Sequence, residues 1–104
     1  MRRLPLDPVL TTTTRLSIVA LLAAADEVDF GTVRDAAELS DSALSKQASA
    51  LEAAGYISVR KGYVGKRPRT WLRLTASGRA ALRSYVAALN SIVAAADQEQ
   101  GTDA

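Results

Sequence analysis

The chain has 104 residues, of which 48% are hydrophobic, and its formal net charge is +2. This length allows one domain with a modest core, and the composition is that of a folded protein rather than a disordered one. Histidine and cysteine are both absent, which removes the commonest zinc ligands, the commonest general base and any disulfide framework. The glycines fit no phosphate-binding loop, so the sequence predicts no enzyme activity, no metal and no cofactor.

The amino-terminal segment indicates neither export nor a membrane anchor. Residues 4–10 form a short apolar arm, but Asp7 and Pro8 interrupt what would be the apolar region of a signal peptide. No apolar run approaches the roughly 20 residues that cross a bilayer. We therefore expect a cytoplasmic protein, in which Asp7 caps a helical turn that begins at Pro8.

A helix is expected over residues 15–25, where Leu16, Val19 and Leu22 recur at helical spacing. The acidic run at residues 26–29 ends it. A second, short helix should follow at about residues 32–39, with Gly31 or Thr32 as its cap.

The third expected helix, residues 41–54, begins after Ser40, a good N-cap, and ends before Gly55, a good residue for a helix end. An apolar stripe at spacings of four and three residues should face the core, and consists of Leu44, Ala48 and Leu51. The two helices and their tight turn match a helix-turn-helix at about residues 32–54. Its outward residues are small or polar and suit a DNA major groove, although they would also suit a plain solvent face; they are Ser42, Ala43, Ser45, Lys46 and Gln47.

The charge distribution is strongly one-sided. No acidic residue occurs between Glu52 and Asp97, whereas this stretch contains Arg60, Lys61, Lys66, Arg67, Arg69, Arg73, Arg79 and Arg83. Such a stretch is typical of a protein with a polyanionic partner.

A basic β-hairpin is predicted at about residues 56–74. Residues 56–60 and 70–74 alternate with a period of two, so that Ile57 and Val59 should pair with Leu74 and Leu72 at the core. Two glycines and a proline mark the turn between them. A hairpin directly after a helix-turn-helix is the wing of a winged helix, and its expected DNA contacts are Arg60, Lys61, Lys66, Arg67 and Arg69. Trp71 faces the other side and is expected to pack over the hairpin or against arginine stems rather than on a base.

The last helix is expected at about residues 75–96, capped by Thr75, with residues 97–104 as a frayed tail of the single domain 1–104. Its apolar residues are spaced 4, 3, 4, 3, as in the seam between packed helices. The seam could pack within its own subunit, but we favour a dimer interface, formed with the amino-terminal arm by Leu4, Leu6, Leu82, Tyr85, Val86, Leu89, Ile92 and Val93.

Three runs, at residues 51–57, 60–71 and 74–79, resemble the small winged-helix DNA-binding proteins related to the MarR group of bacterial regulators, and residues 6–9 and 15–16 also fit. The resemblance covers about residues 4 to 94. It implies a mainly α winged helix-turn-helix with amino- and carboxy-terminal dimerisation helices, a recognition helix and a DNA-gripping wing. Relatives often have Asn at the position of Ala43 and His at that of Gln47, so the resemblance implies the fold but does not carry over particular base contacts at these two positions.

The function expected from these features is a sequence-specific regulator of transcription that binds double-stranded DNA as a homodimer and represses. The alternative is a winged-helix module whose partner is another protein. A small-molecule effector is possible, but no polar constellation in the sequence identifies one.

Overall fold

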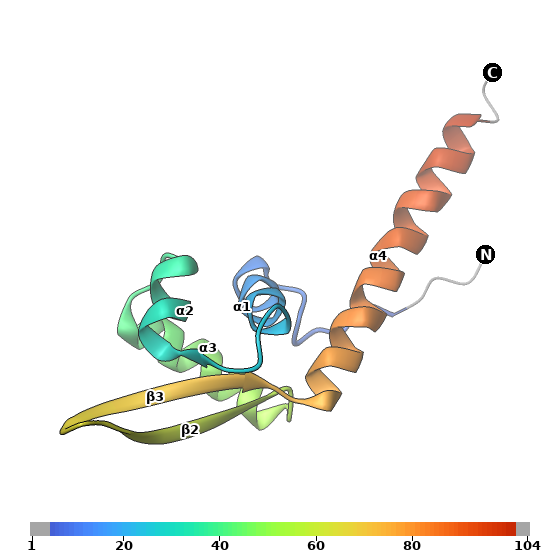
Figure 1. Cartoon of the computed structure of the whole chain (residues 1–104). Coiled ribbons are helices and arrows are strands. Elements are labelled where there is room, and N and C mark those ends of the chain that lie inside the picture. Colours follow the sequence, from blue (N-terminus) through green and yellow to red (C-terminus); the bar gives the residue numbers. More distant parts are fainter. Residues whose placement is uncertain (1–4, 102–104) are drawn as a thin grey trace.

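The computed structural model describes residues 5–101 and contains four helices and a small three-stranded sheet in that range (Figure 1). In chain order the elements are α1 (Thr13–Ala23), β1 (Val28–Asp29), α2 (Phe30–Ala36), α3 (Asp41–Ala53), β2 (Ile57–Val64), β3 (Arg67–Leu74) and α4 (Ala76–Gly101). The expected class, mainly α with a β-hairpin wing, is therefore confirmed.

One core joins the three short helices to the base of the sheet. The helices α1, α2 and α3 and the strand β3 each place apolar side chains there, and the largest fully buried ones are Leu10, Ile18, Leu22, Leu44, Leu51 and Leu72. Burying one such side chain stabilises the fold by about 1.5–3 kcal/mol. The core therefore fixes α3 against the hairpin.

The sheet is antiparallel, with strand order β1-β3-β2. Ile57 pairs with Leu74 and Val59 with Leu72, the register that the alternating pattern predicts. The strand β1 differs from the sequence prediction, which has only a connection at residues 26–29. Its two residues pair with β3 at Leu72 and Trp71. A two-residue strand carries no periodic signal, and this one forms because β3 has a free edge beside it.

The second helix begins and ends earlier than predicted. It starts at Phe30, with Asp29 rather than Gly31 or Thr32 as the N-cap, and ends at Ala36. The hydroxyl of Thr32 instead donates to the carboxylate of Asp29, which lowers the pKa of Asp29. Pairing of β1 with β3 fixes the chain up to Asp29, so that the helix starts at the next residue.

Two helices end in the same hydrogen-bonded motif with different residues. After α3, Gly55 has φ +81°, and the amide of Tyr56 donates to the carbonyl of Leu51 at 3.0 Å. After α2, Glu38 has φ +57°, and the amide of Leu39 donates to the carbonyl of Arg34 at 3.0 Å. Both are Schellman ends, in which glycine is the residue that carries no steric cost.

The start of α4 lies directly on the loop that follows α3. The amide of Thr75 donates to the carbonyl of Tyr56 at 3.0 Å, and the hydroxyl of Thr75 caps the helix by accepting from the amide of Gly78 at 3.0 Å. A Cβ atom on Gly78 would lie 2.1 Å from the Tyr56 carbonyl oxygen. Only glycine allows this approach, which sets the direction in which α4 leaves the body.

The molecule is elongated, with extents of 66 × 24 × 21 Å and a radius of gyration of 16.8 Å. A compact chain of this length would have a radius of gyration of about 13 Å. The difference arises because the hairpin and α4 extend away from the body in different directions (Figure 1).

The amino-terminal arm packs against the body. Its helical turn is confirmed: the carboxylate of Asp7 accepts from the amide of Val9 at 2.9 Å, and Leu10 is fully buried. The hydroxyl of Tyr56 also donates to Asp7, which joins the arm to the loop before β2. Leu4 lies outside the described residues. None of the helices in residues 5–101 is long and apolar enough to span a membrane.

Candidate nucleic-acid interface

The helix α3 has three distinct sides, and the predicted recognition residues lie on two of them. Its buried side is the predicted stripe, Leu44, Ala48 and Leu51. The outward side carries Ser42, Ser45 and Lys46, which are exposed. Ala43 and Gln47 are half-buried on the remaining side. The five residues therefore do not form one uniform surface.

Gln47 is held by a residue that the sequence reading did not assign to the site. Its side-chain Oε1 accepts from Nε of Arg15, on α1, at 2.8 Å. The Nη1 of Arg15 also donates to the carbonyl of Val9 at 3.5 Å. No pattern in the sequence indicates this pair, because 32 positions separate Arg15 from Gln47 along the chain.

An ion pair joins the start of α3 to α2. Arg34, on α2, bonds to Asp35 at 2.9 Å and to Asp41 at 2.8 Å. These two carboxylates raise the pKa of Arg34 further above its ordinary value. Asp41, in the first turn, also lies where the helix dipole favours a negative charge.

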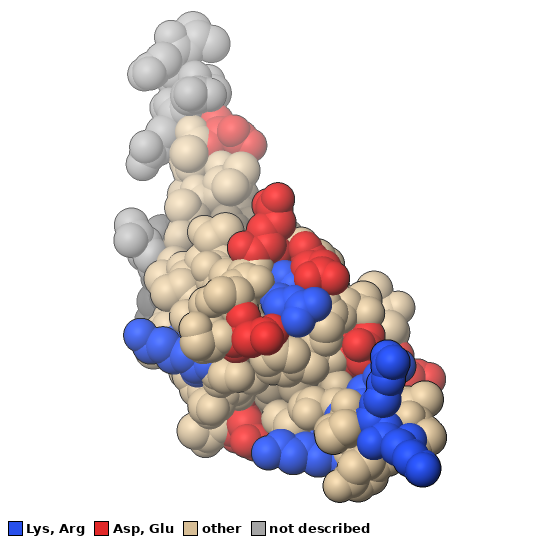
Figure 2. All heavy atoms as spheres, turned by 90° about the vertical axis from the view of Figure 1, so that its left-hand side faces the viewer, with Lys and Arg blue, Asp and Glu red and all other residues tan. Residues whose placement is uncertain are grey.

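The exposed cations of the wing lie near its tip. Lys66, Arg67 and Arg69 are exposed around the turn, where Gly65 has φ +63°. Figure 2, turned so that the end with the wing faces the viewer, shows several Lys and Arg side chains in its lower part and most of the Asp and Glu side chains above them. The tip can therefore contact an anionic surface without folding back on the body.

Arg60 differs from the other predicted wing residues, because it is engaged within the chain. Its guanidinium makes two hydrogen bonds to the carboxylate of Glu27, at 2.7 and 3.1 Å, and lies 4.0 Å from the centre of the Trp71 ring. The hydrogen bond from Arg60 lowers the pKa of Glu27. The packing expected for Trp71 is confirmed, and Arg60 joins the hairpin to the loop after α1 instead of pointing freely outward.

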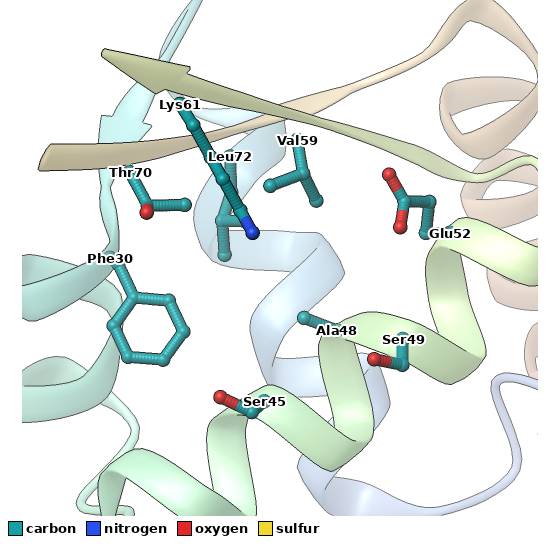
Figure 3. Close-up of a pocket in the computed structure, with 9 residues that line it drawn as sticks. All are labelled: Phe30, Ser45, Ala48, Ser49, Glu52, Val59, Lys61, Thr70 and Leu72. Carbon is teal, nitrogen blue, oxygen red and sulfur yellow. The ribbon is translucent and has the colours of Figure 1, made fainter.

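An open groove of about 420 Å³ lies between α3 and the hairpin (Figure 3). Its floor is apolar, and its polar lining consists of Ser45, Ser49, Glu52, Lys61 and Thr70. Lys61 reaches across the groove from β2 toward α3. Ser49 and Thr70 were not among the predicted site residues, because hydroxyls carry no signal by themselves. The cation and three hydroxyls can donate to a chain of phosphates, whereas Glu52 would oppose it.

The predicted dimer residues differ in their exposure. Val86, Leu89 and Val93 leave 46%, 37% and 57% of their surface exposed along one side of α4. Tyr85, with 5% exposed, packs in the core of its own chain, so its surface is already taken. Leu6, Leu82 and Ile92 are half-buried.

In residues 5–101 no cluster of carboxylates could hold a metal ion.

Comparison with known proteins identifies a family model and solved structures that this chain resembles. The model of a family described as "winged helix DNA-binding domain" matches residues 14–93. An uncharacterized protein of Methanocaldococcus jannaschii is 28% identical over 72 residues, which cover 69% of this chain and 78% of that protein. A transcriptional regulator homologue from Pyrococcus horikoshii has a similar structure, with a TM-score of 0.79, 22% identity, and coverage of 86% of this chain and 88% of its own.

Two larger regulators have the same fold over part of their length. The transcriptional regulator MosR of Mycobacterium tuberculosis, solved in complex with DNA, matches at a TM-score of 0.68 and 21% identity, over 86% of this chain and 63% of its own. A MarR-family regulator from Silicibacter pomeroyi matches at 0.59 and 27% identity, over 88% and 58%. This chain therefore belongs to the winged helix DNA-binding domain family, and its fold is that of the MarR-like transcriptional regulators.

Proposed function

We propose that this chain is a cytoplasmic transcription regulator that binds double-stranded DNA as a homodimer and represses by occupying its operator. The observation that carries the proposal is the placing of an exposed polar helix face, a hydroxyl-lined groove and a cationic hairpin tip next to one another. A helix enters a major groove and a hairpin tip can reach the adjoining minor groove, and one phosphate strand separates these two grooves. Lys61, Ser49 and Thr70 line the groove where that strand would lie.

Each part of the interface has a different task in this proposal. Lys46 and the serines of α3 read base edges, because they are exposed on its outward side. Lys66, Arg67 and Arg69 neutralise phosphates or enter the minor groove from the wing tip. Arg60 contributes by positioning, since it holds the base of the hairpin through Glu27 and Trp71. The structure of MosR with DNA supports the use of this fold for DNA binding.

Dimerisation is proposed from α4. One winged helix covers little DNA, whereas two related by a dyad read half-sites roughly 34–36 Å apart. The residues Val86, Leu89 and Val93 offer the apolar surface for such a pair, supported by Leu82 and Ile92. Tyr85 supports this helix from the core instead of contacting the partner. Whether a small molecule modulates binding stays a prediction.

The experiment begins by selecting bound sequences from random DNA and then measures affinity for the preferred site against salt. Replacing Arg67 by Ala should weaken binding to all sequences and flatten the salt dependence by about one unit for each lost phosphate contact. Arg83→Ala is the matched control, because Arg83 is an exposed arginine on α4 away from the wing. Absence of salt-dependent binding in the unaltered protein would contradict the proposal and favour a protein partner.

A further inference from the structure

The apolar seam of α4 has an opposite charge beyond each of its ends. The seam consists of Leu82, which is half-buried, and of Val86, Leu89 and Val93, which are exposed. Arg79 precedes the seam on the helix, Asp97 follows it, and both side chains are exposed. Read from its start, this side of α4 is therefore cationic, then apolar, then anionic.

The two charges lie on the same side of α4. Arg79 and Asp97 are separated by five full turns of the helix, which is about 27 Å and too far for an ion pair within one chain. Nη1 of Arg79 donates to the carbonyl of Ala23 at 3.2 Å. Because a guanidinium has five N–H donors, Arg79 retains others for a carboxylate.

We propose that α4 binds α4 of a second copy in antiparallel orientation, with Arg79 of each chain beside the partner's Asp97. The inference rests on the proposed function, because it takes the dimer from there and adds the orientation and register of its helices. A dyad interface must be complementary to itself, and a helix face that is cationic at one end and anionic at the other meets this condition only when it is reversed.

The apolar seam fixes the register of the antiparallel pair. In one register all four residues find an apolar partner: Leu82 packs on the partner's Val93 and Val86 on the partner's Leu89, and the dyad repeats both contacts. A shift by one heptad would leave two of the four without a partner from the seam. The seam therefore selects the first register.

The charges select the antiparallel orientation over the parallel one. A parallel pair would also join the seams, but it would set Arg79 level with the partner's Arg79 and Asp97 level with the partner's Asp97, so that no opposite charges meet. In the antiparallel register, Arg79 and the partner's Asp97 lie on the same flank and about 1.5 Å apart along the helix axis. Opposite charges placed in this way favour one mode of association over the other.

The arrangement also separates the two DNA-binding bodies. The body lies at the start of α4, and the helix extends away from it (Figure 1). An antiparallel pair places the two bodies at opposite ends. Its centre lies between Val86 and Leu89, so the two copies of Ala76 are about 35 Å apart along the pair. Half-sites one turn of DNA apart require a similar spacing, roughly 34–36 Å.

The test uses disulfide formation, because the chain has no cysteine of its own. A disulfide needs two Cα atoms within about 4.4–6.8 Å. Leu82→Cys and Val93→Cys chains, mixed in equal amounts and oxidised, should form a covalent dimer with one chain of each kind. Val93→Cys alone should not crosslink, because its two copies lie about 16 Å apart along the antiparallel pair. Non-reducing electrophoresis gives the result.

A charge exchange decides the matter if Leu82→Cys does not fold. Asp97→Arg sets two cations against each other at both ends of the seam and should weaken association about tenfold at low salt. Adding Arg79→Asp to the same chain should restore most of this loss. Arg83→Glu is the matched control: the same register sets Arg83 beside the partner's Asn90, a neutral amide, so that sedimentation should show no change.

The outcomes separate this inference from the proposed function. A dimer in which Val93→Cys crosslinks to its own copy is parallel, and it would overturn the inference while leaving the proposed dimer and its DNA binding intact. A charge exchange that restores no association would overturn it equally. An unaltered protein that is monomeric at micromolar concentration would instead refute the dimer of the proposed function, and the antiparallel pair with it.

Discussion

The packed body of this molecule buries its apolar side chains, whereas the two projecting parts, the wing and α4, leave many of theirs exposed. In the body, apolar residues such as Ile18, Leu44 and Leu72 are fully buried. On the wing and on α4, Tyr63 and Val93 leave 72% and 57% of their surface exposed, and the cations at the wing tip are exposed as well. Side chains in the body are buried by the chain itself, whereas those in the projections are left available to another molecule.

This difference separates two kinds of mutational effect. A change in the body should alter folding and affect binding only through folding. A change in a projection should alter binding or assembly with little effect on the melting of the body. Arg60 and Gln47 lie at the boundary, because each has a partner in the body and a place in the proposed interface.

The largest effect is expected for Gly78→Ala, which attacks the junction between the body and α4. The added Cβ would lie 2.1 Å from the Tyr56 carbonyl oxygen, a backbone atom that cannot rotate away. Overpacking costs about 1–3 kcal/mol in the free energy of unfolding and occasionally more, and a clash with backbone atoms belongs at the upper end of this range. Denaturant unfolding measures it, with Ser77→Ala at the exposed neighbouring position as the control. A loss as small as that of Ser77→Ala would show that α4 can move freely on the body.

Leu89→Glu tests the projecting side of α4. In a symmetric dimer the substitution places two carboxylates at the apolar seam. This should weaken the association of the dimer about a hundredfold, or about 2.7 kcal/mol. Binding to the selected DNA site should fall as a result. The body should melt as before, since Leu89 is 37% exposed in the single chain. Sedimentation at micromolar concentration gives the association state. Arg83→Glu, which places the same residue elsewhere on α4, should leave it unchanged. A monomeric unaltered protein would contradict the dimer.

Glu38→Gly compares two helix ends within the body. Glu38 and Gly55 occupy the same position in two Schellman ends, and both have positive φ. The left-handed conformation costs a residue with a Cβ roughly 1–2 kcal/mol, which is partly offset by the flexibility of glycine in the unfolded chain. Glu38→Gly should therefore raise the free energy of unfolding by about 1 kcal/mol, and Gly55→Ala should lower it by a similar amount. Opposite signs for the two changes, measured by thermal unfolding, are the expected result; equal signs would contradict it.

The smallest effect concerns pH and the contact between the arm and the body. The hydrogen bond from Tyr56 to Asp7 raises the pKa of Tyr56 above its ordinary value of 10.0. The folded chain holds this proton more tightly than the unfolded chain, so stability is retained below pH 10.0 and falls as the pH rises from there toward the folded pKa. Unfolding measured from about pH 8 to pH 11 should show less decline for Tyr56→Phe. An identical decline in both proteins would show that this contact does not matter.

The sequence by itself determined the elements whose signals are local. Ser40 and Gly55 bound α3, and the alternation at Ile57, Val59, Leu72 and Leu74 gave both the hairpin and its register. The one-sided charge after Glu52 predicted a polyanionic partner, in agreement with the family to which the chain belongs. Caps, periodicity and charge runs act over a few residues, and therefore they can be read without the fold.

Only the tertiary structure decided which candidate side chains are free. The pairs Arg15–Gln47 and Arg60–Glu27 join residues 32 and 33 positions apart, and no local pattern connects them. The burial of Tyr85, the edge strand β1 and the groove with Ser49 and Thr70 depend in the same way on what the fold brings close. The sequence shows that a cation or an amide is present. Which of the donors and acceptors of that side chain stay free depends on its neighbours in space, because each polar atom pairs with the partner that packing places beside it.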